Sequence, residues 1–238
     1  MRLFAIADIH GRLDLLTKLW TELTAVRNLD LSVDKVVFMG DYVDRGPDSY
    51  GVMDFIHKLT LAHPDNVIAL AGNHEWMMIQ YYSRGTPDDK ELWEWNGGLQ
   101  TIDSFHRAGF NSCPSHLLKW LAFAPLFHKE PGFFFSHAPA PRDSYRNIMY
   151  RGLPDFAPDE LIWTYNRDEW GVARDHGNGV IGVCGHVHAL SKGIYAPRFY
   201  DHYIYADSGC GCSPRAPLCA IEVKTREVIY AWPDKVVK

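Results

Sequence analysis

Apolar and polar stretches alternate along the first third of the chain in a pattern that predicts repeated strand–helix units. Three apolar runs are expected to form buried strands, at residues 3–7, 36–39 and 67–70. Leucines at helical spacing predict an amphipathic helix from Leu13 to about Asn28. A second helix is expected to begin at a cap provided by Asp48 or Ser49. Together these elements predict a βαβαβ series.

Strands connected in this way are expected to run parallel in one sheet, because crossover connections are right-handed and return to the same edge. Each predicted strand is followed directly by polar residues. Asp8 and His10 follow the first strand, Asp41 follows the second, and Asn73 and His74 follow the third. Ligands of open α/β sheets bind at the carboxyl ends of the strands. We therefore expect these residues to lie in one site.

The middle of the chain differs from the first third. Residues 75–131 are rich in tryptophan, contain the Gly97–Gly98 break and include a helix-like run over residues 116–127. We interpret about residues 76–130 as a helical insert over the sheet edge rather than as a second domain. The chain is then expected to be one catalytic domain, residues 1–238.

The second half is rich in strand-like runs, and polar residues again follow them. His137 follows one such run, His186 and His188 follow another, and a hairpin is expected over residues 218–232. The predicted fold is α/β, with two mixed β-sheets packed as a sandwich and flanked by helices. The polar site would lie at the carboxyl ends of its strands.

Composition and charge narrow the possible functions. The chain has 238 residues, 47% of them hydrophobic and 22% charged, which is typical of a globular protein with one sizeable core. The formal charge of −5 provides no global attraction to nucleic acid or anionic membranes, and no apolar run reaches the ~20 residues of a membrane span. Five cysteines without a recognisable signal peptide favour reduced thiols. We expect a cytoplasmic protein without nucleic-acid or membrane partners.

The polar residues at the strand ends have the chemistry of a metal centre. Carboxylate, imidazole and amide oxygen together suit Mn, Fe or Zn. Six or seven such ligands are too many for one tetrahedral ion but suffice for two ions if one carboxylate bridges them. Two metals ~3.5–4 Å apart are the usual device for in-line attack on phosphorus. A single histidine or aspartate in such a place is more often an ordinary core, cap or turn residue, but their common position after strands favours a metal site.

Several short motifs resemble those of the phosphoprotein phosphatase family of calcineurin-like metallophosphoesterases. Three of them resemble its first signatures: DIHG (residues 8–11), GDYVDRG (40–46) and GNHE (72–75). Three others are similar to later segments: SHAP (136–139), GHVH (185–188) and NGGLQT (96–101), the last as in small bacterial and phage members. The resemblance implies the calcineurin-like metallophosphatase fold and a dinuclear metal site.

The resemblance also implies a ligand set for two divalent ions. Asp8, His10 and Asp41 would bind the first metal, with Asp41 as the bridge. Asn73, His137 and His186 would bind the second. His188 matches a histidine that the wider superfamily uses on the first metal, and whether it is a seventh ligand stays open. Manganese would serve in an assay, whereas the native pair could be Mn, Fe or Zn.

The catalytic residues are implied in the same way. His74 would be the general acid that protonates the leaving group, and Asp44 would orient it. Arg45 would bind phosphate oxygens through its planar guanidinium. A second arginine is expected between the fourth and fifth motifs, and Arg167 is the best match. Its competitors are Arg142, Arg146, Arg151 and Arg174.

Three functions are considered. The first is a serine/threonine protein phosphatase, for which phosphotyrosine stays open as a further substrate. It would act through attack by a metal-bound water or hydroxide on a phosphorylated protein or small phosphoester. The second is hydrolysis of dinucleoside polyphosphates such as diadenosine tetraphosphate. This activity needs a base-stacking pocket, for which Tyr81, Tyr82, Trp93 and Trp95 are candidates, although core packing explains such aromatics more often. The third, an inactive scaffold, is disfavoured because no motif residue is lost.

Overall fold

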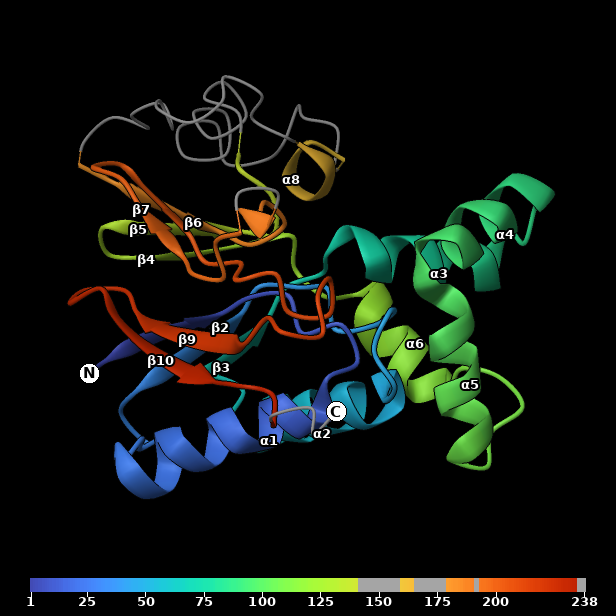
Figure 1. Cartoon of the computed structure of the whole chain (residues 1–238), viewed down its shortest axis with the longest axis horizontal. Coiled ribbons are helices and arrows are strands. Elements are labelled where there is room, and N and C mark those ends of the chain that lie inside the picture. Colours follow the sequence, from blue (N-terminus) through green and yellow to red (C-terminus); the bar gives the residue numbers. More distant parts are fainter. Residues whose placement is uncertain (141–158, 165–178, 191–192, 235–238) are drawn as a thin grey trace.

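Two mixed β-sheets packed face to face form the centre of the protein, with helices outside them (Figure 1). This computed structural model describes residues 1–140, 159–164, 179–190 and 193–234. Within that part of the chain each sheet has five strands. The predicted α/β sandwich is therefore confirmed.

The first sheet contains the three strands predicted from the start of the chain. Its order is β10-β9-β1-β2-β3, in which β1, β2 and β3 run parallel and the two C-terminal strands are antiparallel. The bounds are β1 Leu3–Ile6, β2 Lys35–Phe38, β3 Val67–Ala69, β9 Leu218–Glu222 and β10 Glu227–Ala231. The parallel register brings the ends of the first three strands to one edge, and β9 and β10 form the expected hairpin.

Two helices cover the outer face of this sheet. Helix α1 (Leu13–Thr21) continues into a π-helical turn, η1 (Glu22–Val26), and α2 spans Ser49–Ala62. Their apolar faces are buried in the larger core cluster, together with side chains from β1 and β2. Of the two predicted caps of α2, Asp48 is the one used, because its carboxylate accepts a 2.8 Å hydrogen bond from the Gly51 N–H.

The second sheet has the order β4-β5-β6-β8-β7, with β5, β6 and β8 parallel. Its strands are β4 Phe127–Glu130, β5 Phe133–Ser136, β6 Ile181–Cys184, β7 Arg198–Phe199 and β8 Tyr203–Tyr205. A second core cluster joins the two sheets. It contains Ala5 and Val37 from the first sheet and Phe135, Val183 and Ile204 from the second.

The chain between β3 and β4 is mainly helical and lies at the end of the sandwich away from the N-terminus (Figure 1). It comprises α3 Asn73–Ser83, α4 Pro87–Trp93, the π-helical turn η2 Glu94–Gly98, α5 Leu99–Arg107 and α6 Ser115–Ala122. Later in the chain, α8 (Glu160–Trp163) is a short helix.

One predicted boundary of this segment differs from the structure. The helix-like run over residues 116–127 ends at Ala122, and Phe127 begins strand β4. The reason is tertiary, because residues 127–130 pair antiparallel with β5 at the edge of the second sheet. The range of about 76–130 assigned to the helical insert thus includes one edge strand.

No helix of the described residues is both long and apolar enough to cross a membrane.

Candidate metal centre and active site

The polar residues at the ends of strands from both sheets meet at one place. Asp8, His10 and Asp41 lie in the loops after β1 and β2, and Asn73 and His74 begin α3 directly after β3. From the other sheet come two histidines, His137 after β5 and His186 after β6. All seven side chains are buried, with exposed fractions between 0% and 8%.

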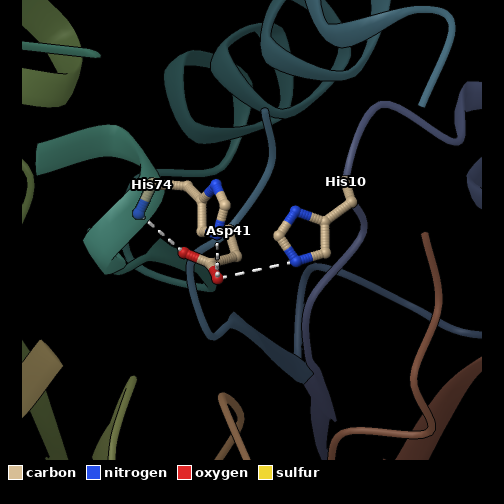
Figure 2. A group of neighbouring side chains, drawn as sticks. All are labelled: His10, Asp41 and His74. Atoms are coloured by element: carbon tan, nitrogen blue, oxygen red, sulfur yellow. Dashed lines mark hydrogen bonds and ion pairs between the residues drawn. The ribbon is translucent and has the colours of Figure 1, made fainter. Parts of the chain in front are cut away.

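Asp41 lies at the centre of this cluster. Within the described residues, His10, Asp41 and His74 form one group whose possible ligand atoms lie within 4.8 Å of one another, and Asp41, His137 and His186 form another. Figure 2 shows the first group converging on the Asp41 carboxylate. Asp41 Oδ2 lies 3.6 Å from His10 Nε2, whereas Oδ1 lies 3.4 Å from His137 Nε2. One carboxylate thus presents a separate oxygen to each group.

The Nδ1 hydrogen bonds of two histidines place the ring lone pair on Nε2, the atom that faces the cluster. His10 Nδ1 lies 2.8 Å from the Val43 carbonyl oxygen, and His137 Nδ1 lies 2.9 Å from that of Met39. A carbonyl oxygen can only accept, so both rings carry their proton on Nδ1. This arrangement is how proteins orient metal-binding histidines. Burial lowers the pKa of both histidines, which favours the neutral ring that a metal requires.

Asn73 strengthens the fit to a cation. Its Oδ1 lies 2.9 Å from His137 Nε2, the atom that carries a lone pair when Nδ1 is protonated. Two atoms that can each offer a lone pair thus lie close enough together to bind one ion. Carboxylate, imidazole and amide oxygen are also a donor set suited to transition metals. The residues present therefore fit divalent ions.

The buried carboxylates of the site also favour bound cations. Burial raises the pKa of Asp41, and the neighbouring charges of Asp8 and Glu75 raise it further. The pKa of Asp207, also fully buried, is raised by burial and by Asp8. Several carboxylates are thus held close together away from water, an arrangement that bound cations would stabilise.

Glu75 holds the loop that carries Asp41, a role the motif analysis did not assign. Its carboxylate accepts hydrogen bonds from the N–H groups of Asp41 and Tyr42, each at 2.7 Å, and of Gly72 at 2.8 Å. Asp41 has a left-handed backbone, with φ 55°. A Cβ on Gly72 would lie 2.2 Å from Asp41 Oδ1, so only glycine fits there. The acidic end of GNHE was the available sequence signal.

His74, Asp44 and Arg45 form a connected group beside the metal-ligand cluster. His74 Nδ1 lies 2.6 Å from Asp44 Oδ2. The Arg45 guanidinium places Nη2 2.9 Å from His74 Nε2 and Nη1 2.7 Å from His10 Nε2. Burial, followed by the charges of His10 and Arg45, lowers the pKa of His74. Cys212, which the sequence analysis gave no role, lies with its Sγ 2.7 Å from Arg45 Nη1.

Three other residues predicted for the site, Asp8, His188 and Arg167, lie outside the two metal-ligand groups or outside the described residues. Asp8 lies outside both compact groups, but its carboxylate accepts the backbone N–H of His186 at 3.0 Å and so lies beside the loop that carries this histidine. His188 is outside both groups, and its Nδ1 accepts the Leu190 N–H at 3.3 Å. Arg167 lies outside the described residues, as do its four competitors, Arg142, Arg146, Arg151 and Arg174.

The aromatic residues considered for a base pocket separate into two kinds. Trp93 is fully buried and packs against Tyr81 and Tyr82, with ring centroids 4.6 and 5.8 Å away. Its indole N–H is directed at Asp44. Trp93 is therefore a core residue with an inward hydrogen bond and is not available for stacking. Trp95 is 88% exposed.

Comparison with known proteins gives a family match over most of the chain. The model of the calcineurin-like phosphoesterase family matches residues 1–190. Symmetrical bis(5'-nucleosyl)-tetraphosphatases of Aromatoleum aromaticum and Psychromonas ingrahamii are 28% and 30% identical, over 58% and 57% of this chain. The matched stretches cover only 44% and 42% of those relatives, so the chain corresponds to less than half of their length. Serine/threonine-protein phosphatase 1 of Salmonella typhimurium is 33% identical over 40% of this chain and 38% of its own.

Solved structures share the architecture at low identity. A candidate diadenosine tetraphosphatase has a TM-score of 0.62 and 17% identity, over 98% of this chain and 94% of that chain. A cold-active protein tyrosine phosphatase has a TM-score of 0.63 and 18% identity, over 96% and 78% of the two chains. At these identities the likeness concerns the fold alone.

Proposed function

The chain belongs to the calcineurin-like phosphoesterase family, and from this we propose that it hydrolyses phosphoesters or phosphoanhydrides with two divalent ions. The observation that carries the proposal is the Asp41 carboxylate, which presents Oδ2 to His10 and Oδ1 to His137. We propose that Asp8, His10 and Asp41 hold one ion, with His188 as an additional ligand. Asp41, Asn73, His137 and His186 would hold the other. When bound, such ions supply an activated water and neutralise charge on the phosphoryl oxygens.

His74 is proposed as the general acid rather than as a ligand. Its Nδ1 is engaged by Asp44, and its Nε2 lies 3.9 Å from Asp41 Oδ2, farther than that of His10. The same Nε2 lies next to the Arg45 guanidinium. A phosphate held by Arg45 would therefore have its leaving-group oxygen near His74. The cationic form of the ring, which carries a proton on Nε2 as well as on Nδ1 and is stabilised by the Asp44 carboxylate, would give its Nε2 proton to that oxygen.

As the substrate we propose a dinucleoside tetraphosphate, ahead of a phosphoprotein. This order reverses the one expected from the motifs. It is supported by the two symmetrical bis(5'-nucleosyl)-tetraphosphatases among the relatives, whose matches are longer than that of the protein phosphatase. The protein phosphatase of Salmonella typhimurium supports the second candidate. In both cases the substrate is a phosphate compound and not a nucleic acid or a membrane.

A side-by-side assay with Mn²⁺ distinguishes the two substrates. We expect higher kcat/KM for diadenosine tetraphosphate than for a phosphothreonine peptide, with ADP as the product of symmetrical cleavage. A chelator should abolish both activities and added Mn²⁺ should restore them. Preference for the peptide would establish the phosphatase instead, and activity that survives chelation and removal of metal would contradict the metal-dependent proposal as a whole.

We expect Arg45→Ala to weaken phosphate recognition more than it slows turnover. A hydrogen bond to a charged group is worth about 1.5–3 kcal/mol, so the loss should raise KM and the inhibition constant for inorganic phosphate by about 10–100-fold. Arg45→Lys should not restore them, because an ammonium cannot reproduce the planar fork. Arg27→Ala is the control, since Arg27 pairs with Glu22 and Glu227 on the surface. An unchanged inhibition constant in Arg45→Ala would remove Arg45 from the phosphate site.

A further inference from the structure

The helical segment between β3 and β4 reaches into the active site through two side chains that the proposed function does not use. These are Trp93, the last residue of α4, and Thr101, in the first turn of α5. We propose that Trp93 and Thr101 are positioning residues that fix the Asp44 carboxylate against His74. The inference rests on the proposed role of His74 as the general acid.

Both residues donate hydrogen bonds to Asp44. Trp93 Nε1 lies 3.0 Å from each carboxylate oxygen, and the Thr101 hydroxyl donates to Oδ1 at 2.7 Å. His74 Nδ1 contacts the other oxygen, Oδ2, at 2.6 Å. Asp44, Trp93 and Thr101 are all 0% exposed, so water does not compete for these bonds. Because Trp93 and Thr101 occupy the other hydrogen-bonding positions of the carboxylate, Oδ2 is held against His74 Nδ1.

Thr101 also holds the backbone of Asp44. Its Oγ1 accepts the Asp44 N–H at 2.8 Å and lies 2.9 Å from the Ser49 hydroxyl. The single Thr101 hydroxyl proton is donated to the carboxylate, so Ser49 must be the donor in the hydroxyl pair. Asp44 has φ 72°, a left-handed conformation that is uncommon for a residue other than glycine. Thr101 thus stabilises both the side chain and the unusual backbone of Asp44.

The turn between these two residues fits closely against the same loop. The Gly97 carbonyl accepts the Arg45 N–H at 3.3 Å, and a Cβ on Gly97 would lie 2.8 Å from that nitrogen. A Cβ on Gly98 would lie 2.5 Å from the Trp93 ring. The two glycines therefore let η2 approach the Asp44–Arg45 backbone and the indole at once. The turn is therefore packed directly against the active-site loop.

The consequence for His74 is a fixed tautomer and ring orientation. A carboxylate held by Trp93 and Thr101 presents an acceptor to Nδ1, so Nδ1 keeps its proton and Nε2 faces Arg45 and Asp41. The proton that the cationic ring gives up therefore comes from Nε2. Without these donors the carboxylate could rotate away or bond elsewhere. The acid would then be present but poorly aligned, which lowers the rate of proton transfer without removing phosphate binding.

The test compares two aryl phosphates that differ in their need for an acid. Phenyl phosphate has a leaving group that requires a proton, whereas 2,4-dinitrophenyl phosphate does not. For Trp93→Phe and Thr101→Val we expect kcat on phenyl phosphate to fall about 10–100-fold, the same range as for the loss of a residue that supports a metal ligand. On dinitrophenyl phosphate kcat should change less than about threefold, and KM should be unchanged for both.

Three further measurements separate positioning from general damage. Thr101→Ser, which keeps the hydroxyl, should restore most of the phenyl phosphate activity. Trp20→Phe is the matched control, because the Trp20 ring packs on Phe38 and Phe55 away from the site, and it should behave as wild type. Proton NMR of the metal-free protein should show the low-field His74 Nδ1–H signal in wild type and a shifted or exchanging signal in Thr101→Val.

The His74→Asn variant separates the positioning role of Trp93 and Thr101 from the general-acid role of His74. If His74→Asn shows the leaving-group selectivity and the Trp93 and Thr101 variants do not, the positioning role is overturned and the acid stands. Equal losses on both aryl phosphates, with an unchanged NMR signal, would likewise overturn it. If His74→Asn itself lacks the selectivity, the acid role fails and the positioning role fails with it.

Discussion

Asp41→Asn is expected to lose bound metal and activity together. Asparagine keeps the shape of the side chain and tolerates the left-handed backbone at this position, where φ is 55°. It cannot, however, supply two anionic oxygens to two ions. Loss of a residue that merely supports a ligand costs about 10–100-fold, so loss of the bridge should lower kcat/KM by more than about 100-fold. Metal content is measured by mass spectrometry of the purified protein.

Thermal unfolding separates this effect from a loss of fold. Burial and the charges of Asp8 and Glu75 raise the pKa of Asp41, which means that its ionised form is unfavourable in the metal-free fold. With a chelator present, Asp41→Asn should therefore be at least as stable as wild type. Added Mn²⁺ should raise the melting temperature of wild type and leave that of the variant nearly unchanged, because binding stabilises only a protein with a site.

Asp44→Asn is the matched variant for this experiment. It changes a buried carboxylate of the same loop that belongs to neither metal-ligand group. We expect it to retain two metals while losing turnover. If Asp41→Asn keeps the wild-type metal content, Asp41 is not a bridge, and the proposed arrangement of the two ions is wrong.

The convergence of Asp8, Asp41 and Asn73 could be predicted because it follows from the sheet. Short apolar runs separated by helices indicate parallel strands, and parallel strands end at one edge. In the structure β1, β2 and β3 are parallel neighbours, so their carboxyl ends lie at one edge. The histidines of the second sheet were harder to place, because the local pattern of apolar and polar residues does not determine how two sheets pack together. Their position directly after strand-like runs was the usable signal.

The support for Asp44 could not be predicted in the same way. Trp93 lies 49 residues and Thr101 57 residues from Asp44 along the chain. In sequence, Trp93 is one of several aromatics in a helical segment, and either core packing or base stacking explains such residues. Only the fold brings its N–H to the carboxylate. Strand β4 was missed for a related reason, because its pairing with β5 outweighs the local pattern.

We expect His74→Asn to lower kcat without removing metal. A positioned general acid contributes about 10²–10⁴-fold, so kcat on phenyl phosphate should fall within that range. The fall on 2,4-dinitrophenyl phosphate should be much smaller, since that leaving group departs without a proton. His57→Asn is the matched control, because the His57 ring packs on His116 and Trp120 outside the site.

The metal content of His74→Asn decides whether His74 is a general acid or a metal ligand. His74 shares a compact group with His10 and Asp41, so a ligand role is chemically possible. Its Nδ1, however, is engaged by Asp44 at 2.6 Å, and its Nε2 is 2.9 Å from Arg45 Nη2, the group proposed to hold phosphate. Retention of two metals with selective loss on phenyl phosphate would support the acid. Loss of one metal, with equal losses on both aryl phosphates, would make His74 a ligand and leave the leaving group to be protonated by another residue.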